Sequence, residues 1–362
     1  MLDVIVVGAG PAGAMAALTL ARAGVRVLVV ERATRPRDAA WGGVLSPRVA
    51  PLLAAVDLSW RDAPGVRALR GWRVHVPGAP PAIVVPRAGE AGPLAVHRGA
   101  FDAWLLAAAV RAGARLEEGW HVRAPLVHDE SGAIRGVVMR RRSAPRVRMP
   151  APLVIAADGR SSRLARGVVP HGACSERWRI VHGAVGDAGV PDLADVVEGP
   201  RMHGGASPVD GRVMGWTAYG SAKNASAIVD DGERVRDARQ GVTVQWMRVR
   251  KARGLPPAGV PGLLFAGDAA GPVDPLGDGI GAAMLGGQLA AEAAIAALES
   301  SDLVVAVRRL TASRAARFEA MWRAARRRCW LRAHPRVLAL VGRGQRFAPG
   351  LAIRWRIHET FT

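Results

Sequence analysis

Short runs of apolar residues along the chain predict a parallel sheet that is interrupted and later resumed. Residues 4–7 lead into a glycine-rich turn and an alanine-rich stretch with helical spacing, and a second run, 27–30, ends at Glu31. This order of strand, turn, helix and strand is that of a βαβ unit. Residues 152–157 and 262–267 are two further apolar runs without a polar residue, as in strands that are covered on both faces.

The segments between these runs follow helical or antiparallel patterns. Apolar residues at helical spacing predict helices over 101–112 and 280–298. Residues 120–128 and 134–140 have the pattern of a hairpin, and residues 72–86 that of exposed antiparallel strands. The sequence therefore predicts an α/β fold with a Rossmann-like domain, whose parallel sheet is interrupted by antiparallel strands.

Composition limits the classes of function. The chain has 362 residues and two cysteines, Cys174 and Cys329, without CxxC spacing, so we expect no disulfide framework. Its formal charge is +20, but nearly all of this charge is arginine spread over the whole chain. We attribute it to GC-rich coding and expect no nucleic-acid partner, because no RNP motif or zinc-finger spacing is present. Gln288 and Glu292 interrupt the longest apolar stretch, so we expect no membrane-spanning helix.

The first turn has the spacing of a dinucleotide site. Gly8 permits the tight turn, Gly10 lets the backbone approach a pyrophosphate, and Gly13 allows close contact between helix and strand. The helix that begins at Pro11 directs its N–H groups and the positive end of its dipole at the phosphates. Glu31 lies 18 residues after Gly13, where a carboxylate accepts hydrogen bonds from ribose hydroxyls and repels a 2′-phosphate.

Two later segments suit the remainder of such a ligand. Asp268 follows the run 262–267 and precedes small residues, so it can accept hydrogen bonds from a polyol chain; capping of the next turn is the alternative. The glycine-rich residues 275–281 open the alanine-rich helix, where backbone can pass beside a flat ring and the helix dipole stabilises negative charge. The alternative for this loop is turn geometry alone. Asp158 ends the run 152–157, again with turn capping as its alternative.

These three motifs, in this order, resemble those of FAD-dependent oxidoreductases with the p-hydroxybenzoate-hydroxylase fold, the group A flavoprotein monooxygenase superfamily. The resemblance extends to about residue 300. Residues 41–48, Trp-Gly-Gly-Val-Leu-Ser-Pro-Arg, look like the GG-x-LSPR element of the geranylgeranyl-reductase-like branch. Residues 96–105 are similar to the helix start whose arginine contacts FAD in these proteins.

The resemblance implies a domain division and a set of cofactor contacts. We expect an FAD-binding domain, a substrate domain with an antiparallel sheet, and a C-terminal helical segment. Their ranges are 1–70, 95–170 and 255–300 for the first, 71–94 and 171–254 for the second, and 301–362 for the third. The residues expected to bind FAD are Gly8, Gly10, Pro11, Ala12, Gly13, Glu31, Arg32, Gly43, Arg98, Asp158, Gly267, Asp268, Gly279, Ile280 and Gly281.

Each motif has an implied role. Glu31 would hold the adenosine ribose, Arg98 the diphosphate region and Asp268 the hydroxyls of the ribityl–phosphate chain. We expect no metal site and identify no catalytic residue. The histidines near the predicted substrate region are isolated, and an isolated histidine is more often structural; they are His75, His97, His182 and His203.

Departures from the reductase branch decide the favoured reaction. The aromatic YxWxFP element of prenyl reductases is replaced by Gly-Gly-Ala-Ser-Pro-Val at 204–209, and Trp41 stands where those reductases often have a cysteine. We therefore favour a monooxygenase that takes hydride from NADH or NADPH and hydroxylates an aromatic or polyketide-like molecule through a flavin C4a-hydroperoxide formed with O2. The alternative enzyme reduces carbon–carbon double bonds in an isoprenoid or lipid. An alternative of another class is an FAD-less binding or membrane-associated module.

The C-terminal region has two interpretations. Phe318, Met321 and Trp322 lie at helical spacing among many arginines. This apolar face can pack on the protein as a pocket lid, which we favour, or the basic helix can lie on an anionic membrane surface and collect a lipid substrate. We expect a cytoplasmic protein, with peripheral membrane contact through this helix as the alternative.

Overall fold

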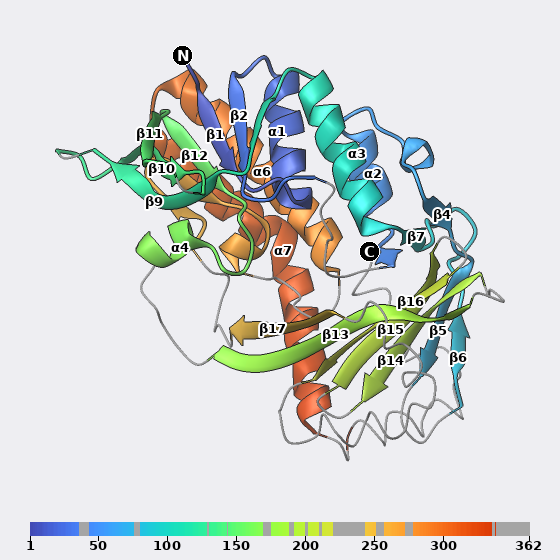
Figure 1. Cartoon of the computed structure of the whole chain (residues 1–362). Helices are drawn as coiled ribbons and strands as arrows, with labels where there is room; N and C mark the ends of the chain where they lie inside the picture. The colour runs from blue at the N-terminus through green and yellow to red at the C-terminus, as the bar shows by residue number, and fades with distance from the viewer. Residues whose placement is uncertain are drawn as a thin grey trace.

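The computed structural model has a parallel sheet with its helices and, below it in Figure 1, a larger and mainly antiparallel sheet. The predicted α/β class, with a separate antiparallel sheet and C-terminal helix, is confirmed. The structure describes residues 1–35, 43–75, 80–128, 130–142, 144–168, 175–187, 192–199, 202–209, 212–219, 243–250, 257–271, 278–334 and 337. Trp41 and residues 272–277, which belong to two of the predicted motifs, lie outside these ranges.

A six-stranded sheet forms the centre of the upper part, in the order β18-β19-β12-β1-β2-β8. Its strands are β1 (Val4–Val7), β2 (Val27–Glu31), β8 (Arg115–Glu118), β12 (Leu153–Ala156), β18 (Gly259–Val260) and β19 (Leu263–Phe265). β1 pairs in parallel with both β12 and β2, so that Val6 lies opposite Ile155 and Val29. All residues of β1, β12 and β19 are buried, which explains why these runs carry no polar side chain.

Helices cover this sheet. They are α1 (Pro11–Arg22), α2 (Val49–Ala54), α3 (Arg98–Arg111), α4 (Arg163–Val168), α6 (Gly279–Ser300) and α7 (Leu303–Ala333), with short 3-10 turns η1 (Trp60–Asp62) and η3 (Gly267–Ala270). Among the described residues, α6 is the one helix that is long and apolar enough to cross a membrane, but 72% of its most apolar window is buried inside the protein. It is therefore placed as a core helix of this fold.

A seven-stranded sheet forms the lower part, in the order β17-β13-β16-β15-β14-β5-β6. Its strands are β5 (Gly71–His75), β6 (Ala82–Val84), β13 (Ser175–Asp187), β14 (Leu193–Gly199), β15 (Met202–Val209), β16 (Arg212–Tyr219) and β17 (Thr243–Arg250). β5 pairs in parallel with β14, and its Trp72 and Val74 are buried. The expectation of exposed strands over 72–86 is therefore wrong for β5, because Trp72 and Val74 pack in a buried cluster with Leu69, Val84, Ala95 and Ala194.

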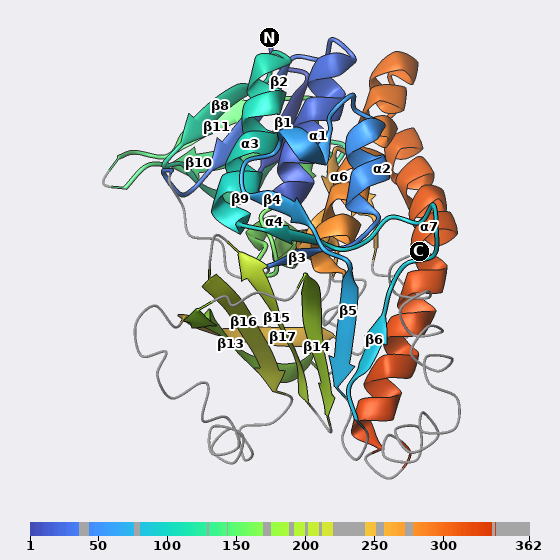
Figure 2. The ribbon, with the colours of Figure 1, turned by 90° about the vertical axis from the view of Figure 1, so that its right-hand side faces the viewer.

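Two three-stranded sheets complete the fold. One has the order β11-β10-β9, and the other has the order β3-β7-β4. Their strands are β3 (Val44–Leu45), β4 (Val66–Ala68), β7 (Leu94–Val96), β9 (His121–Val127), β10 (Ile134–Arg140) and β11 (Val147–Pro150). Figure 2 shows α7 extending from the helices of the upper part down past the seven-stranded sheet. Phe318 and Met321 of α7 are buried in the same core as α1 and α6.

α6 and α1 cross so closely that the contact requires a glycine. A Cβ atom built on Gly287 would lie 2.1 Å from the carbonyl oxygen of Ala12, whereas one on the neighbouring Gly286 would lie 3.3 Å from its nearest atom, the backbone nitrogen of Gly267. The crossing fixes α6 against the first turn of α1, where the predicted phosphate site lies.

We expect Gly287→Ala to lower the free energy of unfolding by about 1–3 kcal/mol, because the added methyl group pushes the helices apart in a packed core. Gly286→Ala is the matched control, and we expect it to cost less than half as much. Urea unfolding followed by circular dichroism measures both changes. Equal stability of the two variants would contradict the packing argument.

Candidate functional site

The glycine-rich turn brings backbone, and no side chain, to the start of α1. Gly8 has a φ of 103°, and a Cβ atom on it would lie 2.4 Å from the carbonyl oxygen of Ala157. A Cβ atom on Gly13 would lie 1.8 Å from the carbonyl oxygen of Gly8. Gly10 is the N-cap of α1, which has Pro11 as its first residue, no side-chain cap and no acidic residue in its first turn. The N–H groups of this turn are therefore left for an external anion.

Glu31 supports this turn directly. The residue is 4% exposed, its Oε2 accepts a hydrogen bond from the backbone N–H of Ala9 at 2.7 Å, and its Oε1 accepts one from that of Ala33 at 2.9 Å. This structural role of Glu31 is not evident from the sequence, where its spacing suggests only a ribose contact. Each carboxylate oxygen can accept a further hydrogen bond, so the ribose contact stays a prediction.

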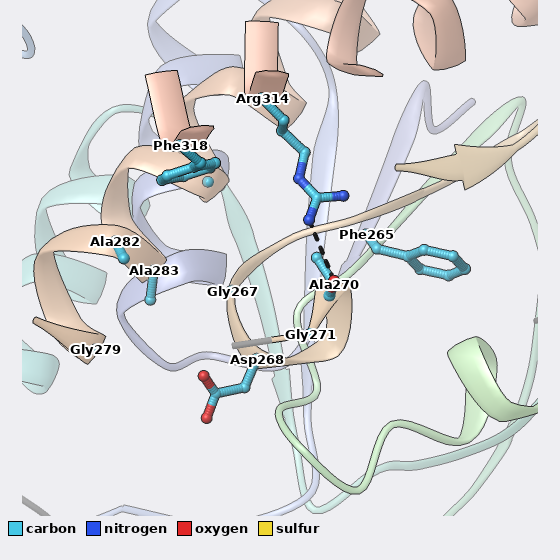
Figure 3. Close-up of a pocket in the computed structure, with 11 residues that line it drawn as sticks. Phe265, Gly267, Asp268, Ala270, Gly271, Gly279, Ala282, Ala283, Arg314 and Phe318 are labelled. Carbon is cyan, nitrogen blue, oxygen red and sulfur yellow. Dashed lines mark hydrogen bonds between the residues drawn. The ribbon is translucent and has the colours of Figure 1, made fainter. Parts of the chain in front are cut away.

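The first and third motifs meet in space. η3 begins at Gly267, and a Cβ atom on Gly267 would lie 2.8 Å from Cβ of Ala12. The side chain of Asp268, the next residue, points away from Arg314 and Phe318 of α7 (Figure 3). Nε of Arg160 donates to Oδ2 of Asp268 at 2.7 Å, so the second motif joins the other two. This ion pair was not predicted, since nothing in the local sequence relates Arg160 to Asp268.

The start of α6 is held by a buried ion pair. Oδ1 of Asp278 caps the helix by accepting the N–H of Gly281 at 2.9 Å, and Nη1 of Arg48 lies 3.3 Å from Oδ2. The side chains are 2% exposed for Asp278 and 15% exposed for Arg48. The Leu-Ser-Pro-Arg segment at 45–48 thus contacts the predicted flavin-binding helix start, Gly279, Ile280 and Gly281. Oγ of Ser46 is buried there without a hydrogen-bond partner in the described part of the chain.

Arg98 is placed at the first turn of α3 and forms an ion pair within that helix. Its Nε donates to Oδ1 of Asp102 at 3.1 Å, and its Nη2 donates to Oδ2 at 3.0 Å. The preceding His97 caps α3, because its Nδ1 accepts the N–H of Ala100 at 3.3 Å. The carbonyl oxygen of Gly43 accepts the N–H of Val96 at 3.0 Å, which places Gly43 beside the start of α3. Contact of Arg98 with a diphosphate stays a prediction, as does that of the exposed Arg32.

Asp158 lies at the carboxyl end of β12 and has one satisfied and one unsatisfied oxygen. Oδ2 accepts the backbone N–H of Arg163 at 3.1 Å, so the capping role considered for Asp158 is present. Oδ1 is buried without a partner among the described residues. Burial raises the pKa of Asp158, although its hydrogen bonds and the charge of Arg32 act in the opposite direction.

A residue of α7 is hydrogen-bonded to the backbone of η3. Arg314 is 3% exposed and donates to the carbonyl oxygens of Pro257 at 3.1 Å and Ala270 at 3.2 Å. Burial lowers its pKa to about 10. Together with Phe318 it lines a cavity of about 20 Å³ between η3, α6 and α7 (Figure 3). The role of Arg314 is not evident from the sequence, because it is one of many arginines in this helix.

The described residues fit a dinucleotide better than a metal ion. The first turn of α1 offers uncapped N–H groups, and Asp158 and Ser46 present buried oxygens without partners. In the described part of the chain, no group of three or more His, Cys, Asp or Glu side chains could hold a metal. Fold and site together define a Rossmann-like dinucleotide-binding protein.

Comparison with known proteins identifies the dinucleotide. Residues 1–204 match the family model described as "FAD binding domain". Digeranylgeranylglycerophospholipid reductase 1 of Methanopyrus kandleri is 30% identical over 324 residues, which is 83% of this chain and 82% of that protein. The chain belongs to the FAD-binding family of flavoprotein oxidoreductases with the p-hydroxybenzoate-hydroxylase fold, in its geranylgeranyl-reductase-like branch. It is therefore an FAD-dependent oxidoreductase, as the sequence analysis predicted.

Solved structures show the same fold. A geranylgeranyl bacteriochlorophyll reductase-like protein from Thermoplasma acidophilum has a TM-score of 0.84 at 23% identity, with 99% of this chain and 96% of that chain covered. A probable FAD-dependent monooxygenase from Pseudomonas aeruginosa has a TM-score of 0.68 at 17% identity, with 99% of each chain covered. The fold alone thus occurs in both classes of flavoenzyme.

We expect Arg48→Met to lower the free energy of unfolding by about 3–5 kcal/mol, because it removes one partner of a buried ion pair. Adding Asp278→Asn removes the remaining charge and should recover part of the loss. A double-mutant cycle measured by urea unfolding separates the pair energy from the loss of packing. A fully additive cycle would show that the two side chains do not interact.

We expect the stability of Asp158→Asn, relative to the unchanged protein, to rise with pH. The raised pKa of Asp158 means that its favourable contribution is fully present below the ordinary carboxyl pKa of 3.8 and is lost as the pH rises through the pKa of the folded state. Asparagine imitates the protonated form, so the two proteins should be most alike at the acid end. Urea unfolding across the pH range measures this difference, and a difference that is constant with pH would refute the assignment.

Proposed function

We propose that this protein reduces carbon–carbon double bonds in an isoprenoid chain, with NADH or NADPH as the source of electrons. The observation that carries the proposal is its similarity to the Methanopyrus kandleri reductase over four-fifths of both chains. That protein acts, by its name, on a lipid with geranylgeranyl chains. The proposal thus prefers the reductase alternative of the sequence analysis to the hydroxylase.

The residues of the site have binding and positioning roles in this proposal. The first turn of α1 holds the diphosphate of FAD through backbone N–H groups, and Asp268 holds hydroxyls of its ribityl chain. Arg48 and Asp278 fix the start of α6, whose dipole stabilises negative charge on the ring. Bound FAD supplies a hydride when it is reduced, and the proton for the second carbon comes from solvent or substrate-site water.

A second candidate is hydroxylation of an aromatic or polyketide-like molecule. It is supported by β15, whose residues 204–209 lack the aromatic side chains of the prenyl-reductase element. The two reactions differ in their need for O2, since hydroxylation incorporates an oxygen atom and reduction of a double bond does not. This difference separates the two candidates without knowledge of the natural substrate.

We expect the FAD-loaded protein, reduced under nitrogen, to be reoxidised by a geranylgeranyl lipid and to add two hydrogen atoms per double bond. Flavin absorbance follows the reoxidation, and mass spectrometry detects the product. FAD-free protein is the control for substrate reduction by the chemical reductant. If turnover requires O2 and a phenolic substrate gains oxygen, the reductase proposal is wrong and the second candidate is supported.

A further inference from the structure

A second pocket, lined mainly by arginines, lies on the sheet β9–β11 beside α4. Its volume is about 340 Å³. The lining residues are Arg123, Ala124, Val138, Arg140, Arg146 and Arg163. Within the described ranges, none of the four arginines forms an ion pair with a carboxylate. The pocket therefore carries concentrated positive charge that the described part of the protein does not neutralise.

A β-bulge directs these side chains to one face. Ala124 lies opposite Val138 and Val122 lies opposite Met139, which leaves Arg123 as an extra residue in β9. A bulge of this kind turns two successive side chains to the same face, here Arg123 and Ala124. Arg140 follows Val138 by two positions and so shares that face, while Met139 is buried on the other. The backbone of the sheet therefore places Arg123 and Arg140 on the same face.

Arg123 is the arginine of this pocket that is least well accommodated by its surroundings. Nε of Arg123 is buried and has no hydrogen-bond partner in the described residues. Burial, together with the charges of Arg140 and Arg163, lowers the pKa of Arg123. The pKa of the adjacent His121 is lowered for the same reasons, burial first and then the charges of Arg123 and Arg32. A bound anion would supply the missing acceptor and relieve the repulsion.

We propose that this pocket binds a phosphate or diphosphate group of a small-molecule ligand. Guanidinium groups bind phosphate oxygens in a planar, bidentate geometry. Four arginines are balanced better by a multiply charged phosphate or diphosphate than by a single carboxylate. Arg163 also links the pocket to the predicted FAD site, because its backbone N–H donates to the carboxylate of Asp158. Two sources of the group are a nucleotide with a phosphomonoester, such as a 2′-phosphate, and a prenyl diphosphate.

Titration calorimetry of the FAD-loaded protein with inorganic pyrophosphate tests the proposal, since bound FAD blocks its own phosphate site. We expect saturable binding that is about tenfold weaker in Arg140→Gln and in Arg146→Gln, because each loses charged hydrogen bonds. Arg135→Gln is the matched control: Arg135 is an exposed residue of β10 that does not line the pocket, and its loss should change the affinity less than about twofold. Thermal unfolding checks that each variant is folded, and the exposed Arg146 provides the test if Arg140→Gln is unstable.

Two organic probes distinguish the sources. Tighter binding of 2′,5′-ADP than of pyrophosphate supports the pocket as a nucleotide site, and tighter binding of farnesyl diphosphate supports it as a prenyl-diphosphate site. The proposal is overturned if pyrophosphate does not bind saturably, or if Arg135→Gln weakens binding as much as Arg140→Gln. Because the measurement is binding by flavin-loaded protein, its failure leaves the reductase proposal untouched, and failure of reduction leaves the pocket untouched.

Discussion

The structure depends on one steric constraint: backbone must reach the first turn of α1 from several directions at once. The turn at Gly8 closes on Gly13, η3 reaches Ala12 through Gly267, and α6 crosses at Gly287. A side chain at any of these glycines would collide with neighbouring atoms and push the sheet, η3 or α6 away from the start of α1. The crowding keeps side chains away from the helix start, so its N–H groups stay available to a diphosphate.

The carboxylates around the predicted cofactor site are mostly paired with groups of the protein itself. Three of the carboxylates around a site that is expected to hold an anionic cofactor are compensated by partners within the protein. Glu31 accepts backbone N–H groups, Asp268 pairs with Arg160, and Asp278 pairs with Arg48. The compensation lets these carboxylates orient hydroxyls and helix ends without repelling the diphosphate.

The sequence predicts those strands and helices whose burial follows from their own run of apolar residues. The apolar runs of β1, β2, β12 and β19 are buried strands of one sheet, and the alanine-rich run is α6. What sequence could not supply were pairings between distant residues: β5 beside β14, Arg160 with Asp268, and Arg48 with Asp278. One arginine among fifty basic residues has no local signal for such a role, because its partner is chosen by the tertiary fold. The bulge at Arg123 is of the same kind, since a one-residue register shift depends on the neighbouring strand.

The reach of Arg314 gives the C-terminal helix a share in the cofactor site. Its guanidinium group spans the gap from α7 to the carbonyl oxygen of Ala270, two residues beyond Asp268. The same helix continues past the seven-stranded sheet (Figure 2), so one helix runs beside both main sheets of the enzyme. A chain shortened to end before residue 314 would thus lack the hydrogen bond that ties η3 to the C-terminal helix.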